Sequence, residues 1–399
     1  MRQVEAKLSV HDRVLAVLQG RTPDRHPFCD RLELWHTALV RQGRLPTEFE
    51  GLSLPDVHRS VGIGQLKFVA PCAFRLRGVE MVVAVDGEET YRETDPVTSI
   101  YPALEDLVET DRPGLTTFEL RTPVGSIRVG QLMLEEAVLW GETSYLQEHP
   151  IKGPEDFKTA HWILDHIELV PRFEDIYEEA AAIGDIGFVV PHLSRIPFQE
   201  VLLDYLGEIP TFYALADDPA PVLALMEAIH ALRLETAALL EGLDYPYVEV
   251  SDNLTGQMTS PKLFAEHALP HYQAYADLYH RQGKTFGSHT DGDLKPLLRL
   301  LRESGLDVCE SFSPAPLTEC TFDEAWDAWG GGKPIMWGVI PSPLLEERTP
   351  ESELHAFVDH VLERVGRDPI IFGVSDMVLG NNLIERVRYV ADRIERHIL

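Results

Sequence analysis

The sequence predicts a (β/α)8 barrel, and three observations support this fold class. Eight short apolar segments alternate with amphipathic helical stretches, a pattern typical of parallel strands joined by helices. No GxGxxG turn occurs, so a closed barrel is favoured over an open dinucleotide-binding sheet. A length of 399 residues suits a barrel with insertions. We therefore expect one barrel domain over residues 1–399.

The predicted elements follow one another along the chain. An amphipathic helix over 9–18 opens the sequence, and turn residues follow it before the first strand. The later helices include 221–243 and 351–365. The eight strands are predicted at 27–30, 66–70, 187–191, 247–251, 284–288, 308–312, 334–339 and 369–374.

Residues 72–150 differ from the rest of the chain and predict a β-rich insertion. The segments 79–94 and 116–130 are rich in Val, Thr, Tyr and Glu, which nearly alternate in polarity. Gly87 and Gly125 mark turns within them. We expect two antiparallel hairpins here.

Composition narrows the class of protein and its partners. Apolar residues make up 44% and charged residues 25%, as in a soluble globular protein. The formal net charge of −30 argues against nucleic acid as a partner. Four scattered cysteines do not form a disulfide scaffold, and the N-terminus lacks an apolar signal core. No uncharged run reaches the ~20 residues needed to cross a bilayer. We expect a cytoplasmic protein without membrane contact.

The segment 284–310 is the most informative part of the sequence and predicts strand, loop, helix and strand. Asp293 suits the N-cap of a helix over 294–304, with Pro296 in its first turn. Gly305 suits the residue after its C-terminal end. A connection through one helix implies that the two strands are parallel.

Side chains that can bind metal stand at the ends of these two strands. His289 and Asp291 follow the first strand, and Glu310 lies on the second. Asp376 follows the last predicted strand and could join them. One imidazole with two or three carboxylates suits Zn²⁺ or another divalent metal. The alternative is that His289 bonds a backbone group and Asp291 forms an Asx turn before Gly292.

Two further acids accompany the strand predicted at 247–251. Glu249 lies within that strand, and Asp252 follows it. Either could orient the substrate or act as a general acid or base. The alternative is that they cap the following loop.

Three cationic or imidazole side chains are candidates for substrate binding. Arg31 follows the first strand, and His192 and Arg195 follow the third. A guanidinium can hold a carboxylate through two hydrogen bonds. The alternative for Arg195 and His192 is a salt bridge to Glu200 or Asp204.

Several segments carry a resemblance to a known family. They are RTPDRHP (21–27), TPVGSI (122–127), HPIKGPEDF (149–157), SPKLFAEHALP (260–270) and GKTFGSHTDGD (283–293). On these the chain resembles the uroporphyrinogen decarboxylase superfamily over nearly its whole length. The resemblance implies a (β/α)8 barrel of that type, and often a homodimer.

The resemblance does not extend to uroporphyrinogen decarboxylation itself. True decarboxylases of this family carry an arginine-rich, FMRQAGR-like segment after the first strand, whereas residues 28–34 here read FCDRLEL. Only Arg31 could take that place, and an octacarboxylate substrate needs several cations. The sequence therefore argues against this activity.

The methyltransferase branch of the superfamily fits the candidate metal ligands better. Its thiol-alkylating members bind zinc through a His-x-Cys pair and a later Cys, and cobalamin-independent methionine synthase adds a Glu. Here His289 matches the His, Asp291 takes the first Cys position, Glu310 matches the Glu, and Asp376 lies near the last Cys position. Replacing sulfur with oxygen leaves a harder, more Lewis-acidic metal, which suits the activation of an ether oxygen.

The sequence thus favours the substrate-side methyltransferase of a corrinoid-dependent demethylation system. It would transfer a methyl group from a methoxylated compound, with an aromatic one favoured, to the cobalt of a separate corrinoid protein. His289, Asp291, Glu310 and Asp376 would hold a divalent metal, with Zn²⁺ favoured. Two alternatives remain open at this point. One is a cofactor-free decarboxylase that holds a carboxylate with Arg31 or Arg195, and the other is a barrel that only binds a small molecule.

Overall fold

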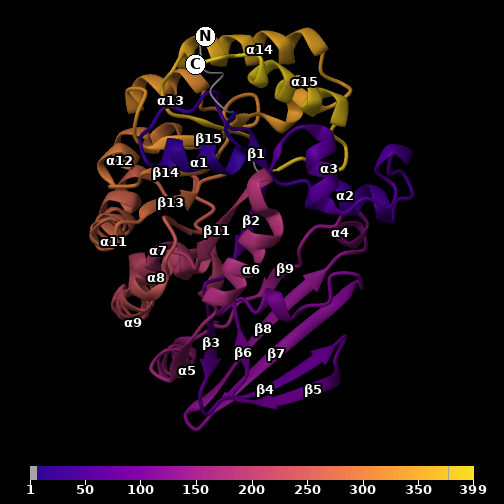
Figure 1. Ribbon diagram of the computed structural model, residues 1–399. Helices are drawn as coiled ribbons and strands as arrows, with labels where there is room; N and C mark the ends of the chain where they lie inside the picture. The colour runs from indigo at the N-terminus through magenta and orange to yellow at the C-terminus, as the bar shows by residue number, and fades with distance from the viewer. Residues whose placement is uncertain (1–6, 376) are drawn as a thin grey trace. The chain divides into compact units, whose positions relative to one another are not determined.

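The computed structural model describes residues 7–375 and 377–399, and it confirms the predicted parallel barrel (Figure 1). Eight strands are hydrogen-bonded in the order β1-β2-β11-β12-β13-β14-β15-β16. Phe28, next to β1, forms a parallel bridge with Phe372 of β16, which joins the two ends of this order. The barrel strands are β1 (Cys29–Asp30), β2 (Gly64–Val69), β11 (Gly187–Leu193), β12 (Tyr247–Val250), β13 (Thr285–His289), β14 (Val308–Phe312), β15 (Ile335–Ile340) and β16 (Ile371–Val374).

Each of the eight predicted strands coincides with one of these, and the differences lie at the ends. The predictions started strands at Pro334 and Pro369, whereas β15 begins at Ile335 and β16 at Ile371. Proline has no N–H to donate to a strand ladder, so regular pairing starts after it. His289 was expected just after a strand, and it is the last residue of β13.

Helices alternate with the barrel strands, as the sequence predicts. The opening helix begins after Ser9, whose side chain accepts from the backbone N–H of Asp12 in a capping box. The helices are α1 (Val10–Leu18), α2 (Glu33–Arg41), α3 (Leu54–Val61), α4 (Glu135–Trp140), α5 (Pro154–Leu164), α6 (Phe173–Ile183), α7 (Pro197–Glu200), α8 (Glu208–Asp217), α9 (Ala220–Leu239), α10 (Pro261–Leu263), α11 (Leu269–Arg281), α12 (Leu298–Glu303), α13 (Phe322–Trp329), α14 (Glu351–Val365) and α15 (Ile384–Glu395).

The helix expected at 294–304 begins differently from its prediction. A short 3₁₀ turn over Lys295–Leu297 precedes α12, and Asp293 Oδ1 accepts from Lys295 N at 3.1 Å. Gly305 follows the helix with a φ of +85°, as expected for a glycine that ends a helix. β13 and β14 on either side are parallel, which confirms the predicted crossover.

An apolar cluster fills the barrel at the N-terminal end of its strands. Phe188, Tyr247 and Trp337 contribute its large rings, and α1 adds Val14 and Val17. The strands add smaller apolar side chains to the same cluster: Cys29, Leu66, Val190, Val308, Ile335 and Ile371. This end of the barrel is therefore packed, so polar chemistry is confined to the other, C-terminal end of the strands.

Contacts within the chain define two compact units. The first comprises 1–69, 175–192 and 245–399 and contains the barrel, and the second comprises 70–174 and 193–244. The sequence-based assignment of a single domain with an insertion at 72–150 stays a prediction.

Antiparallel sheets dominate the second unit. One sheet has the order β5-β4-β7-β8-β9 and the other β10-β3-β6. The predicted hairpins are confirmed as β4 with β5 and β7 with β8. The strands are β3 (Cys72–Leu76), β4 (Glu80–Val85), β5 (Glu88–Thr94), β6 (Val97–Thr98), β7 (Gly114–Thr122), β8 (Gly125–Met133), β9 (Tyr145–Glu148) and β10 (Ile167–Pro171).

Two composition-based expectations can be compared with the structure. All four cysteines are buried and unpaired, in line with the expected absence of a disulfide scaffold. Among the described residues, no helix combines the length and apolar character needed to span a bilayer.

Two buried imidazoles should make the stability of the barrel unit depend on pH. Burial lowers the pKa of His58 to about 3 and that of His26 to about 4, although the Gly366 carbonyl accepts from His26. In the unfolded chain a histidine titrates near about 6.5. Below that pH the unfolded state binds protons that the folded state does not, so the free energy of unfolding decreases as the pH is lowered. We expect a loss of about 1.4 kcal/mol per pH unit for each histidine between about pH 6 and pH 4.

Urea unfolding at a series of pH values checks this prediction. A His58→Leu variant should show a shallower fall in unfolding free energy over the same range, because one of the two groups is gone. The exposed His360, on α14, provides the matched control, and His360→Ala should keep the slope of the natural protein. An identical slope in His58→Leu and the natural protein would contradict the prediction.

Candidate functional site

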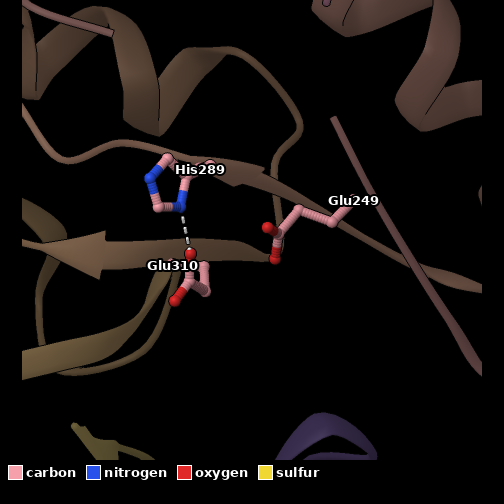
Figure 2. Close-up of side chains that lie close together, drawn as sticks. All are labelled: Glu249, His289 and Glu310. Carbon is pink, nitrogen blue, oxygen red and sulfur yellow. Dashed lines mark hydrogen bonds and ion pairs between the residues drawn. The ribbon is translucent and has the colours of Figure 1, made fainter. Parts of the chain in front are cut away.

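Three buried side chains meet at the C-terminal end of the barrel: Glu249, His289 and Glu310 (Figure 2). One ligand atom from each lies within 4.8 Å of the others. They come from three consecutive strands, β12, β13 and β14. The register places His289 beside Glu310, and it places Glu249 beside Gly287, two residues before His289 on the same face of β13. The parallel pairing of the strands thus assembles the cluster.

His289 lies between two carboxylates. Its Nδ1 is 2.5 Å from Glu310 Oε2, and its Nε2 is 3.8 Å from Asp291 Oδ2. Burial alone would lower the pKa of His289, but the charges of Glu310 and Asp291 raise it well above its ordinary value. The pKa of Asp291 is lowered despite burial, because His289 and the Asn253 amide stabilise its charge. The two neighbouring carboxylates thus favour the protonated form of the imidazole.

Glu249 is fully buried, and only one of its two carboxylate oxygens accepts a hydrogen bond. Its Oε2 accepts from Tyr247 Oη at 2.6 Å. Its Oε1 accepts no hydrogen bond from any described residue, and His192 Nε2 lies 3.8 Å away. Burial, followed by the charge of Glu310, raises the pKa of Glu249 well above its ordinary value. A buried carboxylate in this position requires a proton or a cation.

These three residues fit a divalent metal ion. One imidazole nitrogen and two carboxylate oxygens form a donor set that Zn²⁺ and harder divalent ions accept. The unsatisfied Oε1 of Glu249 supplies an acceptor that a cation would occupy. Asp291 is not a member of this group of three, because it faces the opposite nitrogen of His289 from Glu310. Asp376, the other predicted ligand, lies outside the described residues.

An aromatic column stands beside the cluster. The Phe68 ring stacks on His192 with centroids 4.4 Å apart, and it meets His289 edge-on at 6.2 Å. The guanidinium carbon of Arg31 lies 4.7 Å from the Phe68 centroid. Arg31 and His192, both predicted to bind substrate, both contact Phe68, and the His192 ring meets that of His289 edge-on with centroids 6.5 Å apart. Phe68 was not singled out from the sequence, since a phenylalanine on a buried strand carries no signal of a site.

Arg195, the third predicted substrate ligand, belongs to the second unit. Its Nε donates to Asp204 Oδ2 at 3.0 Å, which is the salt bridge considered as an alternative. Glu200, the other partner considered, pairs with Arg233. A substrate-binding role for Arg195 stays a prediction.

Asp252 lies on the other side of β13 from His289. Its Oδ2 accepts from Tyr272 Oη at 2.5 Å and from Ser288 Oγ at 3.1 Å. Ser288 precedes His289, so their side chains point to opposite faces of the strand. This geometry describes a carboxylate that holds β13 against α11. A catalytic role for Asp252 stays a prediction.

Asp30 is the last residue of β1 and was not among the residues predicted to form the site. It is buried, and its carboxylate accepts from the backbone N–H groups of Arg31 and Val374. Burial raises the pKa of Asp30 to about 8, despite these donors. The side chain ties the end of β1 to β16, where the barrel closes.

The backbone is irregular next to Glu310. Ser311 has a φ of +59°, and the pairing of β14 with β15 shifts register between Cys309 and Phe312. A left-handed conformation at a non-glycine residue costs about 1–3 kcal/mol and persists where the surroundings enforce it. A bulge of this kind changes the direction of neighbouring side chains. The sequence VCESF of β14 contains no glycine or other residue that would predict this bulge.

Fold and site together define a (β/α)8 barrel with a buried histidine–carboxylate cluster at the C-terminal strand ends. No protein-family model matches the sequence, and no curated protein matches it. Among solved structures the chain is similar to a methyltransferase from Methanosarcina mazei, with 14% sequence identity and a TM-score of 0.56. The match covers 97% of this chain and 99% of that one. At this identity the likeness shows a shared fold.

Proposed function

We propose that this chain is a methyltransferase, and specifically the substrate-side component of a corrinoid-dependent O-demethylation system. The buried cluster of Glu249, His289 and Glu310 carries the proposal. The methyltransferase fold of the Methanosarcina mazei protein and the resemblance to the uroporphyrinogen decarboxylase superfamily support it. The cluster has no sulfur ligand, which favours a substrate whose leaving atom is oxygen.

In this proposal the cluster binds a divalent metal, with Zn²⁺ favoured. Such an ion would polarise the ether oxygen and stabilise the negative charge that develops there when the methyl group leaves. Glu249, His289 and Glu310 would supply its protein ligands. Asp291 would hold the ring of His289 through Nε2. Asp252 would stabilise β13 from the face opposite to His289.

The remaining side chains would position the methoxylated, preferably aromatic, substrate. Arg31 would bind an anionic group of the substrate, and Phe68 would keep Arg31 and His192 in fixed positions beside His289. The methyl acceptor would be the cobalt of a separate corrinoid protein. The chain would act as a cytoplasmic homodimer.

The direct test combines metal analysis with a demethylation assay. Purified protein should contain about one divalent ion per chain, and it should convert a methoxybenzoate to the corresponding phenol only when cob(I)alamin is supplied as acceptor. Removing the metal with a chelator should stop turnover, and Zn²⁺ should restore it. Release of carbon dioxide without acceptor or metal would instead identify a decarboxylase. Ligand binding without turnover would identify a binding protein.

Arg31 should contribute mainly to substrate binding. We expect Arg31→Ala to raise KM for an anionic methoxylated substrate by roughly 10- to 100-fold, since a charged hydrogen bond is worth about 1.5–3 kcal/mol. The value of kcat should change less, because Arg31 does not contact the leaving oxygen in this proposal. Steady-state kinetics measure both constants. Arg44→Ala, at an exposed arginine, is the control, and equal KM values in all three proteins would contradict this role.

A further inference from the structure

Glu249 is held in place by a neighbour on its own strand. Tyr247 and Glu249 are two residues apart on β12, so both point to the same face. Tyr247 Oη donates to Glu249 Oε2 at 2.6 Å, and both side chains are completely buried. This bond fixes one carboxylate oxygen and leaves Oε1 directed into the cluster with no hydrogen bond from any described residue.

The path of the tyrosine side chain depends on a glycine of the next strand. A Cβ atom at Gly287 would lie 2.0 Å from Tyr247 Oη and 2.7 Å from its Cζ. Any other residue at 287 would therefore displace the hydroxyl from its present position. The φ of Gly287 is not in the left-handed region, so the requirement is for space and not for backbone freedom.

We propose that Glu249 is the third protein ligand of the metal and that Tyr247, lodged over Gly287, is the positioning residue that orients it. This inference rests on the proposed function, which places a metal on the cluster with Glu249 among its ligands. It adds the means by which the oxygen donor on β12, one strand before His289, is held in position. Hydrogen bonds to ligating carboxylates commonly change metal affinity by 10- to 100-fold. Tyr247 should therefore act on binding without touching the ion.

Metal affinity of the full chain tests the inference without reference to turnover. Zn²⁺ dissociation constants can be measured by competition with a chromophoric chelator, and Co²⁺ absorption reports the coordination number. We expect Glu249→Gln to weaken Zn²⁺ binding by on the order of 100-fold or more and Tyr247→Phe by roughly 10-fold. Gly287→Ala should weaken it as well, although all three ligands and the tyrosine hydroxyl remain.

A matched control separates positioning from packing. Tyr245 packs against the same apolar core as Tyr247 but does not bond Glu249, so Tyr245→Phe should bind Zn²⁺ within about twofold of the natural protein. If Tyr247 serves packing alone, Tyr247→Phe will lower the unfolding midpoint and leave the Zn²⁺ dissociation constant unchanged, which overturns its positioning role.

The outcomes also separate this inference from the proposed function. Natural affinity in Glu249→Gln, together with lost affinity in His289→Ala, would remove Glu249 from the ligand set and leave a metal-dependent methyltransferase intact. Absence of any Zn²⁺ or Co²⁺ binding by the natural protein would overturn the ligand assignment and the metal-dependent mechanism together. If Glu249→Gln lost methyl transfer but kept the natural Zn²⁺ affinity, Glu249 would not be a metal ligand. A role in proton transfer would then explain the loss.

Discussion

Under the proposed function, His289→Ala is expected to abolish metal binding at the cluster and to lower methyl transfer by on the order of 1,000-fold. His289 is the one nitrogen donor of the cluster, and its ring bridges Glu310 and Asp291. Without it, the cluster keeps only the two carboxylates of Glu249 and Glu310 as metal ligands. Two oxygen donors without an imidazole are an incomplete protein ligand set for a divalent ion such as Zn²⁺. Loss of an electrophile at the leaving oxygen removes several kcal/mol of transition-state stabilisation, and about 4 kcal/mol corresponds to this rate effect.

Elemental analysis and kinetics on the same preparations measure both effects. His360→Ala is the matched control, because His360 also faces a carboxylate, Asp323, but on the exposed surface of α14. It should keep the metal content and the rate of the natural protein. Full metal content in His289→Ala would exclude His289 as a ligand, and a natural rate would exclude it from the reaction.

Trp337→Ala should destabilise the barrel unit by about 3–5 kcal/mol. The indole is 1% exposed and lies in the apolar cluster beside Phe188 and Tyr247. Its Nε1 donates to the Cys29 carbonyl at 2.9 Å, so it links β15 to β1 across the interior. Truncation leaves a large cavity and an unpaired carbonyl, and close-packed barrel walls cannot collapse into the space.

Trp337→Phe separates the two contributions. It keeps a ring in the cluster but removes the N–H donor and part of the indole volume, so we expect a smaller cost than for alanine, about 1–2 kcal/mol. Equilibrium unfolding in urea, followed by far-UV circular dichroism, gives both values. If Trp337→Ala cost less than 1 kcal/mol, the apolar cluster could not be the main source of stability of this end of the barrel.

The barrel could be predicted because its signals are local. Each strand is an apolar run that ends at a turn residue, and each helix carries an apolar face, so both can be recognised from neighbouring residues. The hairpins of the second unit could be predicted from the alternation of polar and apolar residues and from the turn glycines Gly87 and Gly125. The ends of strands shifted where proline cannot join a ladder.

The candidate site was predictable only in part, because its members meet through strand register. His289 and Glu310 are 21 residues apart and were joined correctly because β13 and β14 are consecutive in sequence and in space. The orientation of Glu249 depends on a tyrosine that crosses a glycine of the next strand, which no spacing along the chain reveals. The stacking of Phe68 on His192 depends in the same way on the pairing of β2 with β11. The bulge at Ser311 is likewise a property of the paired strands.

The cluster of Glu249, His289 and Glu310 contains no sulfur, which affects how the protein can be handled. Thiolate ligands are lost to peroxide and to alkylating reagents, whereas carboxylates and imidazole resist both. The four cysteines of this chain are buried, and none belongs to the cluster. A metal held by Glu249, His289 and Glu310 should therefore survive air and iodoacetamide. In a demethylation system built this way, the oxygen-sensitive step would belong to the partner that carries the cobalt.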